Sequence, residues 1–199
     1  MKKFNQPIMI LGFALSVILC GTLFFGVKAI VVSATQRELP IYCVEHEEKL
    51  ASLTFDAAWG ADDTQTLIDI LAKYDVKATF FLVGQWVDKY PDKVKLLYDS
   101  GHEIMNHSNT HPKFTLLSKT KIEAELEACS EKIKAITGIK PDLFRPPYGD
   151  YDNKVITTSR ELGYEVIQWN VDSLDWKNLT AQEIFNRVTA KTVDRKSVV

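Results

Sequence analysis

The chain has 199 residues, which is enough for one ordinary domain with an appendage. Hydrophobic residues make up 46% of it, so we expect a globular core rather than a low-complexity chain. The formal net charge is only −2, which excludes the strongly basic class typical of nucleic-acid binding, and a neutral or polymeric substrate fits better.

The N-terminal stretch from Phe4 to Val27 differs from the rest because it carries no charged residue. It is long enough to cross a bilayer, which takes about 20 apolar residues, and too long for the roughly 7–15-residue apolar region of a cleaved signal peptide. Lys2 and Lys3 precede it, so the positive-inside rule places the remainder outside the cytoplasm. We predict a single-pass anchor in the cell membrane over residues 1–33 and a linker over 34–49. Cleavage next to Ser33 is the alternative.

From Leu50 onward, short apolar runs alternate with amphipathic segments. The apolar runs predict strands at Leu50–Asp56, Ala78–Val83, His102–Asn106, Leu143–Arg145 and Tyr164–Trp169. The amphipathic segments predict helices at Thr64–Tyr74, Asp92–Ser100, Thr120–Gly138, Lys154–Leu162 and Thr180–Thr192. Capping boxes begin two of these helices, at Thr120 with Glu123 and at Thr180 with Glu183.

Alternating strands and helices with short connections predict an α/β fold with a mostly parallel sheet. The periodicity does not choose between an open sheet and a barrel, and both place functional groups at the carboxyl ends of the strands. The polar residues that end or follow a predicted strand are Asp56, His107, His111, Arg145, Asp172 and Asp175. We therefore expect them to gather on one face of the domain.

His107 and His111 are two of only four histidines, and they lie four residues apart. On a turn of helix or in a tight helical loop, both imidazoles project to the same side and can hold one metal ion. Neutral imidazole suits zinc and its first-row neighbours, and two histidines plus one carboxylate leave a position open for water. The alternative is a pair of surface or capping histidines in a segment that Pro112 ends.

Three further residues are candidates for chemistry beside this pair. Asp56 is placed to remove a proton from a metal-bound water, and Arg145 could hold Asp56 through a bidentate bond. Asp175 adds a carboxylate next to Trp176, an aromatic wall suited to a sugar ring. The alternatives are a strand-end cap for Asp56, a rim arginine, a surface salt bridge for Asp175 and a core tryptophan.

Cys43 and Cys129 show no spacing typical of a metal knuckle or a redox pair. We predict two buried free thiols. A disulfide between them in an exported protein is the alternative.

Four motifs occur in order between Leu50 and Trp176: Thr54-Phe55-Asp56, His107-x-x-x-His111, Arg145-Pro-Pro-Tyr148-Gly149 and Asp172-Ser-Leu-Asp175-Trp176. Together they resemble the polysaccharide deacetylase family (NodB homology, carbohydrate esterase family 4). The Phe-Asp-x-x-Trp-Gly variant and the N-terminal anchor resemble the sporulation-associated members of that family, which act on cell-wall glycan.

The resemblance implies a distorted (β/α) barrel over residues 50–199. It also implies a divalent metal, Zn²⁺ or another such as Co²⁺, and removal of N-acetyl groups from N-acetylglucosamine or N-acetylmuramic acid units. The partners would be cell-wall glycan or peptidoglycan and, through the N-terminal helix, the membrane, with no nucleic acid.

The same resemblance implies a role for each matching residue. Asp56 would be the catalytic base, His107 and His111 metal ligands, and Arg145 the residue that orients Asp56. Tyr148 would give a backbone N–H to the oxyanion. Asp175 would tune a general-acid histidine, and Trp176 would form a wall of the acetyl pocket.

The sequence departs from the family pattern at two places. The family usually has a second aspartate after the base as third metal ligand, and here that residue is Ala57, with Asp62 or Asp63 as possible substitutes. The family pattern also ends with a Leu-x-His strand that supplies the general acid, and no histidine follows His111. We therefore expect a domain that lacks its closing strand and has impaired turnover.

Three functions fit this pattern. A membrane-anchored, metal-dependent glycan N-deacetylase is favoured by the retained Asp56, His107, His111 and Arg145, since binding alone needs no such set. A catalytically silent relative that binds wall glycan is favoured by Ala57. A metal-dependent amidase with a non-sugar substrate is also compatible with the fold.

Overall fold

The computed structural model describes residues 36–44, 46–48, 50–192 and 197–198. All the elements below lie in the compact unit Glu38–Val199. The predicted membrane anchor over residues 1–33 lies outside the described residues. Within the described part of the chain, none of the helices is both long and apolar enough for a membrane span.

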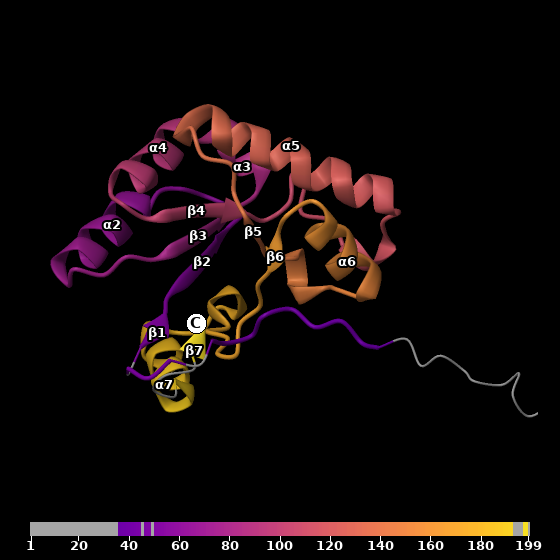
Figure 1. Cartoon of the computed structure of the whole chain (residues 1–199). Coiled ribbons are helices and arrows are strands. Elements are labelled where there is room, and N and C mark those ends of the chain that lie inside the picture. Colours follow the sequence, from indigo (N-terminus) through magenta and orange to yellow (C-terminus); the bar gives the residue numbers. More distant parts are fainter. Residues whose placement is uncertain (1–35, 45, 49, 193–196, 199) are drawn as a thin grey trace, which may run out of the picture. The chain divides into compact units, whose positions relative to one another are not determined.

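A five-stranded parallel sheet forms the centre of the domain, with its strands side by side in chain order (Figure 1). The strands are β2 (Thr54–Ala57), β3 (Thr79–Leu82), β4 (Glu103–Asn106), β5 (Leu143–Phe144) and β6 (Glu165–Val166). A separate parallel pair joins β1 (Ala51–Ser52) to β7 (Ser197–Val198). The parallel α/β sheet is therefore confirmed, and closure into a barrel stays a prediction.

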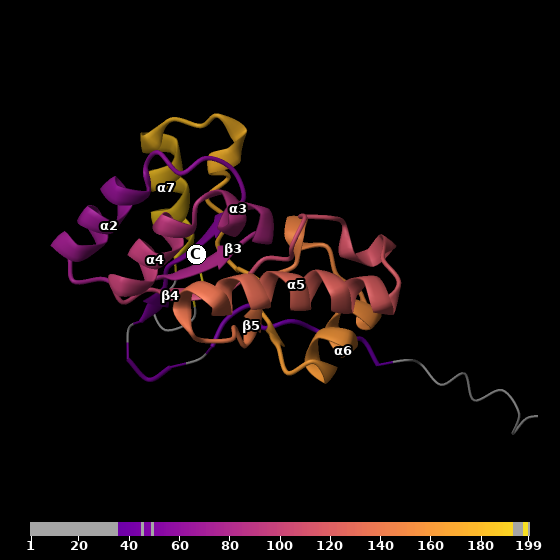
Figure 2. The ribbon, with the colours of Figure 1, turned by 90° about the horizontal axis from the view of Figure 1, so that it is seen from above.

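Helices connect consecutive strands, as parallel pairing requires. They are α2 (Thr64–Lys73), α3 (Gly84–Lys89), α4 (Pro91–Asp99), α5 (Lys119–Thr137), α6 (Asn153–Glu161) and α7 (Ala181–Lys191). The described residues also form three short 3-10 helices, η2 (Phe114–Leu116), η3 (Pro147–Gly149) and η4 (Asp175–Lys177). Figure 2 shows α5, the longest of the described helices, lying alongside the shorter helices that it contacts.

The amphipathic character predicted for the long helix is confirmed in α5, whose apolar stripe of Ile122, Leu126, Cys129 and Ile133 is fully buried. The stripe joins two apolar clusters. Cys129 and Ile133 pack with residues of β3, α3 and α4, while Ile122 and Leu126 pack with residues of β5, β6 and α6. This helix therefore holds the two halves of the sheet together, and burial of each aliphatic side chain contributes about 1.5–3 kcal/mol.

Several predicted elements have different bounds in the structure. The predicted strand Leu50–Asp56 is divided, because Ala51–Ser52 pairs with β7 while Thr54–Ala57 pairs with β3. The last two strands of the sheet are shorter than predicted, and α3 was not predicted at all. Within the predicted linker, Ile41 forms a parallel bridge with Ile167 at the edge of the sheet.

The predicted start of the long helix at Thr120 is wrong. α5 begins at Lys119, and its N-cap is Ser118, whose hydroxyl accepts the N–H of Lys121 at 3.3 Å. Thr120 therefore already lies inside the first turn. The second capping box is confirmed, because Thr180 accepts the N–H of Glu183 while the Glu183 carboxylate accepts the N–H of Thr180.

The two cysteines in the described residues are free, as predicted. Cys129 is buried, which raises the pKa of its thiol to about 12, and its Sγ donates to the carbonyl of Leu82. Cys43 is exposed, so the prediction that both thiols are buried is wrong for this residue. Its segment runs along the outer edge of the sheet, where one side of the chain faces solvent.

The position of the α5 cap can be tested with a matched pair of substitutions. Ser118→Ala removes the acceptor for the Lys121 N–H and should lower the free energy of unfolding by about 1 kcal/mol. Thr120→Ala should change it by less than about 0.5 kcal/mol, because Thr120 does not cap and alanine favours the helix. Urea unfolding measures both, and an equal or larger loss for Thr120→Ala would contradict this assignment.

Candidate functional site

An ion pair between Asp56 and Arg145 lies at the carboxyl ends of the strands. Nη1 of Arg145 donates to Oδ1 of Asp56 at 2.7 Å and to Oγ1 of Thr54 at 2.9 Å. Nη2 donates instead to the carbonyl of Gln168, so the pair has a single bond rather than the predicted bidentate geometry. Arg145 is only 2% exposed, and its guanidinium lies 4.1 Å from the centre of the Phe81 ring. The arginine thus fixes the Asp56 carboxylate from a buried position.

His107 lies against the free oxygen of this carboxylate. Its Nε2 is 3.7 Å from Oδ2 of Asp56, and its Nδ1 is 2.7 Å from the carbonyl oxygen of Arg145. Because a carbonyl only accepts, Nδ1 carries the proton and Nε2 keeps its lone pair. Burial lowers the pKa of His107, so the neutral form is favoured at neutral pH.

The segment from His107 to His111 brings the two histidines together without a helix. Ser108 and His111 have φ of 69° and 60°, so of the two predicted geometries, a turn of helix or a tight helical loop, the turn of helix is wrong. The two rings nevertheless lie 5.1 Å apart, edge to face. A loop with two left-handed residues therefore produces the proximity that helical spacing was expected to produce.

Side chains outside the loop hold this conformation. Oδ1 of Asn106 accepts the Ser108 N–H at 2.7 Å, and the Glu125 carboxylate accepts the N–H groups of Asn109 and Thr110. Gly84 packs against the loop so closely that a Cβ there would lie 2.4 Å from Oδ1 of Asn109. The loop is thus built into the contact between β4, α3 and α5.

His111 is half-buried between exposed aromatic rings. The ring of Tyr148 lies 4.6 Å from it and that of Trp59 lies 6.1 Å from it. Tyr148 has φ of 61° in η3, so its backbone is left-handed rather than helical at this point of the turn. Burial and the neighbouring His107 lower the pKa of His111 to about 4. Trp59 was absent from the predicted site, although it belongs to the Phe-Asp-x-x-Trp-Gly motif.

The structure does not bring Asp175 and Trp176 into contact with these residues. Both are exposed on η4, where Oδ1 of Asp175 accepts the N–H of Trp176. The Trp176 ring lies against Lys177, whose Nζ is 4.8 Å from the ring centre. Asp172 accepts the Leu174 N–H in the turn before η4. The roles of Asp175 and Trp176 stay predictions.

The described residues supply two ligands for a metal but not three. Nδ1 of His107 is bonded to a carbonyl, an arrangement typical of metal-binding histidines, which leaves Nε2 available. In the described part of the chain, Nδ1 of His111 is buried without a hydrogen-bond partner.

A third donor is missing among those residues, because no group of three or more His, Cys, Asp or Glu side chains gathers where it could hold a metal. Asp62 and Asp63 are exposed, and Ala57 packs against the apolar cluster. The residues present therefore do not complete the metal site that the resemblance implies.

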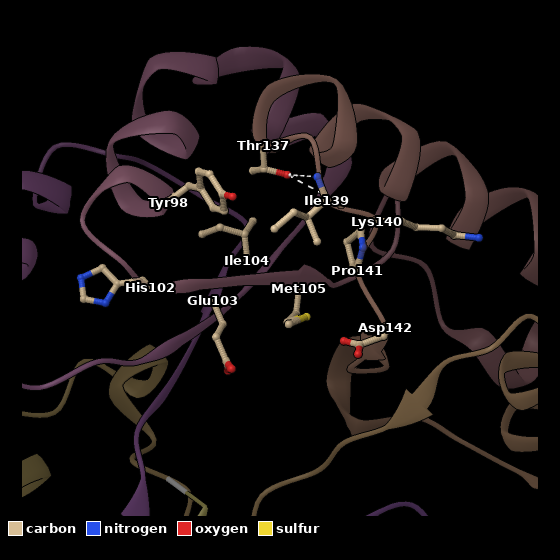
Figure 3. Close-up of a pocket in the computed structure, with 10 residues that line it drawn as sticks. All are labelled: Tyr98, His102, Glu103, Ile104, Met105, Thr137, Ile139, Lys140, Pro141 and Asp142. Atoms are coloured by element: carbon tan, nitrogen blue, oxygen red, sulfur yellow. Dashed lines mark hydrogen bonds between the residues drawn. The ribbon is translucent and has the colours of Figure 1, made fainter.

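A cavity of about 270 Å³ lies away from this site (Figure 3). It is lined by residues at the start of β4, by Tyr98 of α4 and by the segment Ile139–Asp142 after α5. The carboxyl end of β4, where His107 follows, is the opposite end of the same strand. The cavity is therefore separate from the residues that carry chemistry.

A family model and two curated relatives that match this chain belong to the same class of protein. A model of the family described as polysaccharide deacetylase matches residues 44–167. The chain is 36% identical over 137 residues to the peptidoglycan-N-acetylmuramic acid deacetylase PdaA of Bacillus subtilis, which covers 68% of this chain and 52% of that protein. It is 34% identical over 137 residues to a peptidoglycan-N-acetylglucosamine deacetylase of Bacillus cereus, which covers 69% of this chain and 50% of that protein.

A solved structure is also similar. The chain aligns with BA3943, described as a CE4 family pseudoenzyme from Bacillus anthracis, with a TM-score of 0.78 and 35% identity over 81% of this chain and 57% of that one. A mutant of that protein is described as having restored enzymatic activity. The chain spans about half the length of the curated relatives it matches.

The buried histidines predict how stability depends on pH. Burial lowers the pKa of His107 below the ordinary histidine value of 6.5, and burial together with His107 lowers that of His111 to about 4, so the unfolded chain binds more protons between these two pH values. The stability of the metal-free protein should therefore be greatest above pH 6.5 and fall as pH decreases toward 4.

Thermal unfolding in the presence of a chelator measures this dependence. In His111→Asn, the loss of Tm between about pH 7 and pH 5 should be smaller than in the parent protein, because one titrating group is gone. Parallel Tm curves for the two proteins would contradict the prediction for His111.

Proposed function

Because this chain belongs to the polysaccharide deacetylase family, we propose that it hydrolyses N-acetyl groups of cell-wall glycan. The substrate is an N-acetylglucosamine or N-acetylmuramic acid unit of peptidoglycan, since the similar proteins of Bacillus cereus and Bacillus subtilis are named for deacetylation of these two sugars. The reaction breaks the amide C–N bond with water and yields acetate and a free amine.

The observation that carries this proposal is the Asp56 carboxylate held by Arg145 beside Nε2 of His107. A carboxylate with one oxygen fixed and its side chain 32% exposed can take a proton from a water molecule that attacks the acetamide carbonyl. Arg145 positions the base and carries a compensating charge. A purely structural ion pair would not require the second oxygen to face a buried neutral histidine.

The negative charge that develops on the carbonyl oxygen needs donors. We assign one of them to the backbone N–H of Tyr148, which lies in a turn next to His111. Tyr148 is 64% exposed, and its ring lies 4.6 Å from the His111 ring. In this scheme the tyrosine contributes through its main chain, and its ring helps to exclude water.

We further propose that His107 and His111 bind a divalent metal such as Zn²⁺ or Co²⁺ weakly, since neutral imidazoles suit these ions and a third protein ligand is missing among the described residues. For the location, we propose anchoring in the cell membrane through Phe4–Val27, with the domain facing the wall. A role in sporulation is part of the same proposal.

Acetate release from peptidoglycan and from N-acetylglucosamine oligomers, with and without added Zn²⁺, tests the activity. Asp56→Asn should lower the rate by about 10²–10⁴-fold, the usual contribution of a general base. Asp69→Asn, an exposed carboxylate on α2, serves as the matched control and should keep the parent rate. Equal rates for Asp56→Asn and the parent protein would exclude Asp56 as the base.

A second candidate function is a catalytically silent relative that binds wall glycan through the same surface. It is favoured by Ala57 in the place of the third ligand and by the similarity to a protein described as a pseudoenzyme. Absence of acetate above the Asp56→Asn background, together with retained glycan binding, would support this candidate over the first.

Introducing a carboxylate at residue 57 tests whether this position can supply the third metal ligand. In Ala57→Asp, the affinity for Zn²⁺ measured by titration calorimetry should rise by more than about tenfold, since even partners that only orient a ligand change affinity by about 10–100-fold. Ala57→Asn, of the same size but a poorer ligand, is the control. Unchanged affinity in Ala57→Asp would mean that residue 57 does not face the histidine pair.

A further inference from the structure

Trp59 is an exposed aromatic residue beside the candidate site. It follows β2 by two residues and is 80% exposed, whereas Trp86 is 3% exposed. Tryptophan is usually largely buried, because its side chain can remove a large apolar area from water. Its ring lies 6.1 Å from the His111 ring at an angle of 63°. This exposure therefore occurs next to the proposed reacting groups and not on a remote surface.

The backbone that carries Trp59 is held in place. The indole N–H of buried Trp86 donates to the carbonyl of Trp59 at 3.1 Å and to that of Gly60 at 2.7 Å. Gly60 has φ of 28°, a value that residues with a Cβ rarely adopt. The next residue, Ala61, is buried. The turn is thus held at Trp59 and at the two residues after it, with the indole exposed beside His111.

A second exposed ring lies on His111. Tyr148, from the turn after β5, is 64% exposed and its ring is 4.6 Å from the His111 ring. Two aromatic rings from distant parts of the chain therefore contact one histidine and leave much of their surface open. An arrangement of this kind presents flat apolar faces around a polar centre, which is how sites for amphipathic small molecules are built.

We propose that Trp59 is a binding platform for a sugar ring of the glycan. A pyranose has a flat face of C–H groups and a rim of hydroxyls, so it can stack on an exposed indole while its polar groups remain in water. Because Trp59 contacts His111, the sugar it binds is the unit that carries the reacting acetamide or its neighbour in the polymer. The inference rests on the proposed function, since it assumes that the ligand is a glycan.

Binding of an N-acetylglucosamine pentamer to the purified full chain in mild detergent tests the platform. Titration calorimetry on Trp59→Ala should show affinity about tenfold weaker than that of the parent protein, as expected for loss of an aromatic stacking partner. Trp59→Phe keeps an aromatic face and should recover most of the affinity. Tyr74→Ala, which removes another exposed aromatic ring at the end of α2, is the matched control and should bind like the parent.

The outcomes separate this inference from the proposed function. If the parent protein binds the pentamer and Trp59→Ala binds equally well, the platform is wrong and the glycan function stands. If Tyr74→Ala weakens binding as much as Trp59→Ala, the effect is not specific to the site and the platform is again wrong. If the parent protein does not bind the pentamer, the platform is wrong, whereas the proposed function is decided separately by acetate release. Trp59→Ala should unfold at the parent Tm, because the side chain is exposed.

Discussion

The buried guanidinium of Arg145 is the interaction on which the candidate site depends. A charge in the protein interior is costly unless it is paired and hydrogen-bonded, and Arg145 meets this requirement with the Asp56 carboxylate, the Thr54 hydroxyl and the Gln168 carbonyl. Its own backbone carbonyl accepts from His107, and its N–H donates to the Asn106 carbonyl. One residue thus ties together β2, the loop after β4 and the end of β6.

The loop with the two histidines depends on a second set of buried polar contacts. The amide of Asn106 donates to the Leu126 carbonyl and to the Ser130 hydroxyl, which is also bonded to the Tyr164 hydroxyl. Oδ1 of the same Asn106 amide accepts the Ser108 N–H. Asn106 therefore links the buried face of α5 to the loop that carries the histidines. The supports of the site therefore belong to the core, which favours a preorganised role for His107 and His111.

Local sequence patterns predicted which helices and strands form better than they predicted where a helix begins or which conformation a loop adopts. The parallel order of the strands, the buried stripe of α5 and the gathering of Asp56, Arg145 and the histidine pair at one end of the sheet agree with the sequence prediction. The predicted start of α5 was wrong because both Ser118 and Thr120 are residue types that can cap a helix. Only the backbone geometry shows that Ser118 is the N-cap. The spacing of His107 and His111 also suggested a helical turn. The sequence could not show that Ser108 is left-handed, because this conformation is usually recognised by a glycine and serine does not mark it.

The class of the fold and the types of group at the site follow from the residues alone, since hydrophobic periodicity and parallel topology bring strand ends to one edge. The absence of a carboxylate at residue 57 was equally visible in the sequence. Three other features required the folded chain: which nitrogen of His107 is free, the bond of Arg145 to one oxygen of Asp56, and the exposure of Trp59 beside His111. These features arise from contacts between residues far apart in the chain, such as the bond from Trp86 to the Trp59 carbonyl, and no local pattern records them.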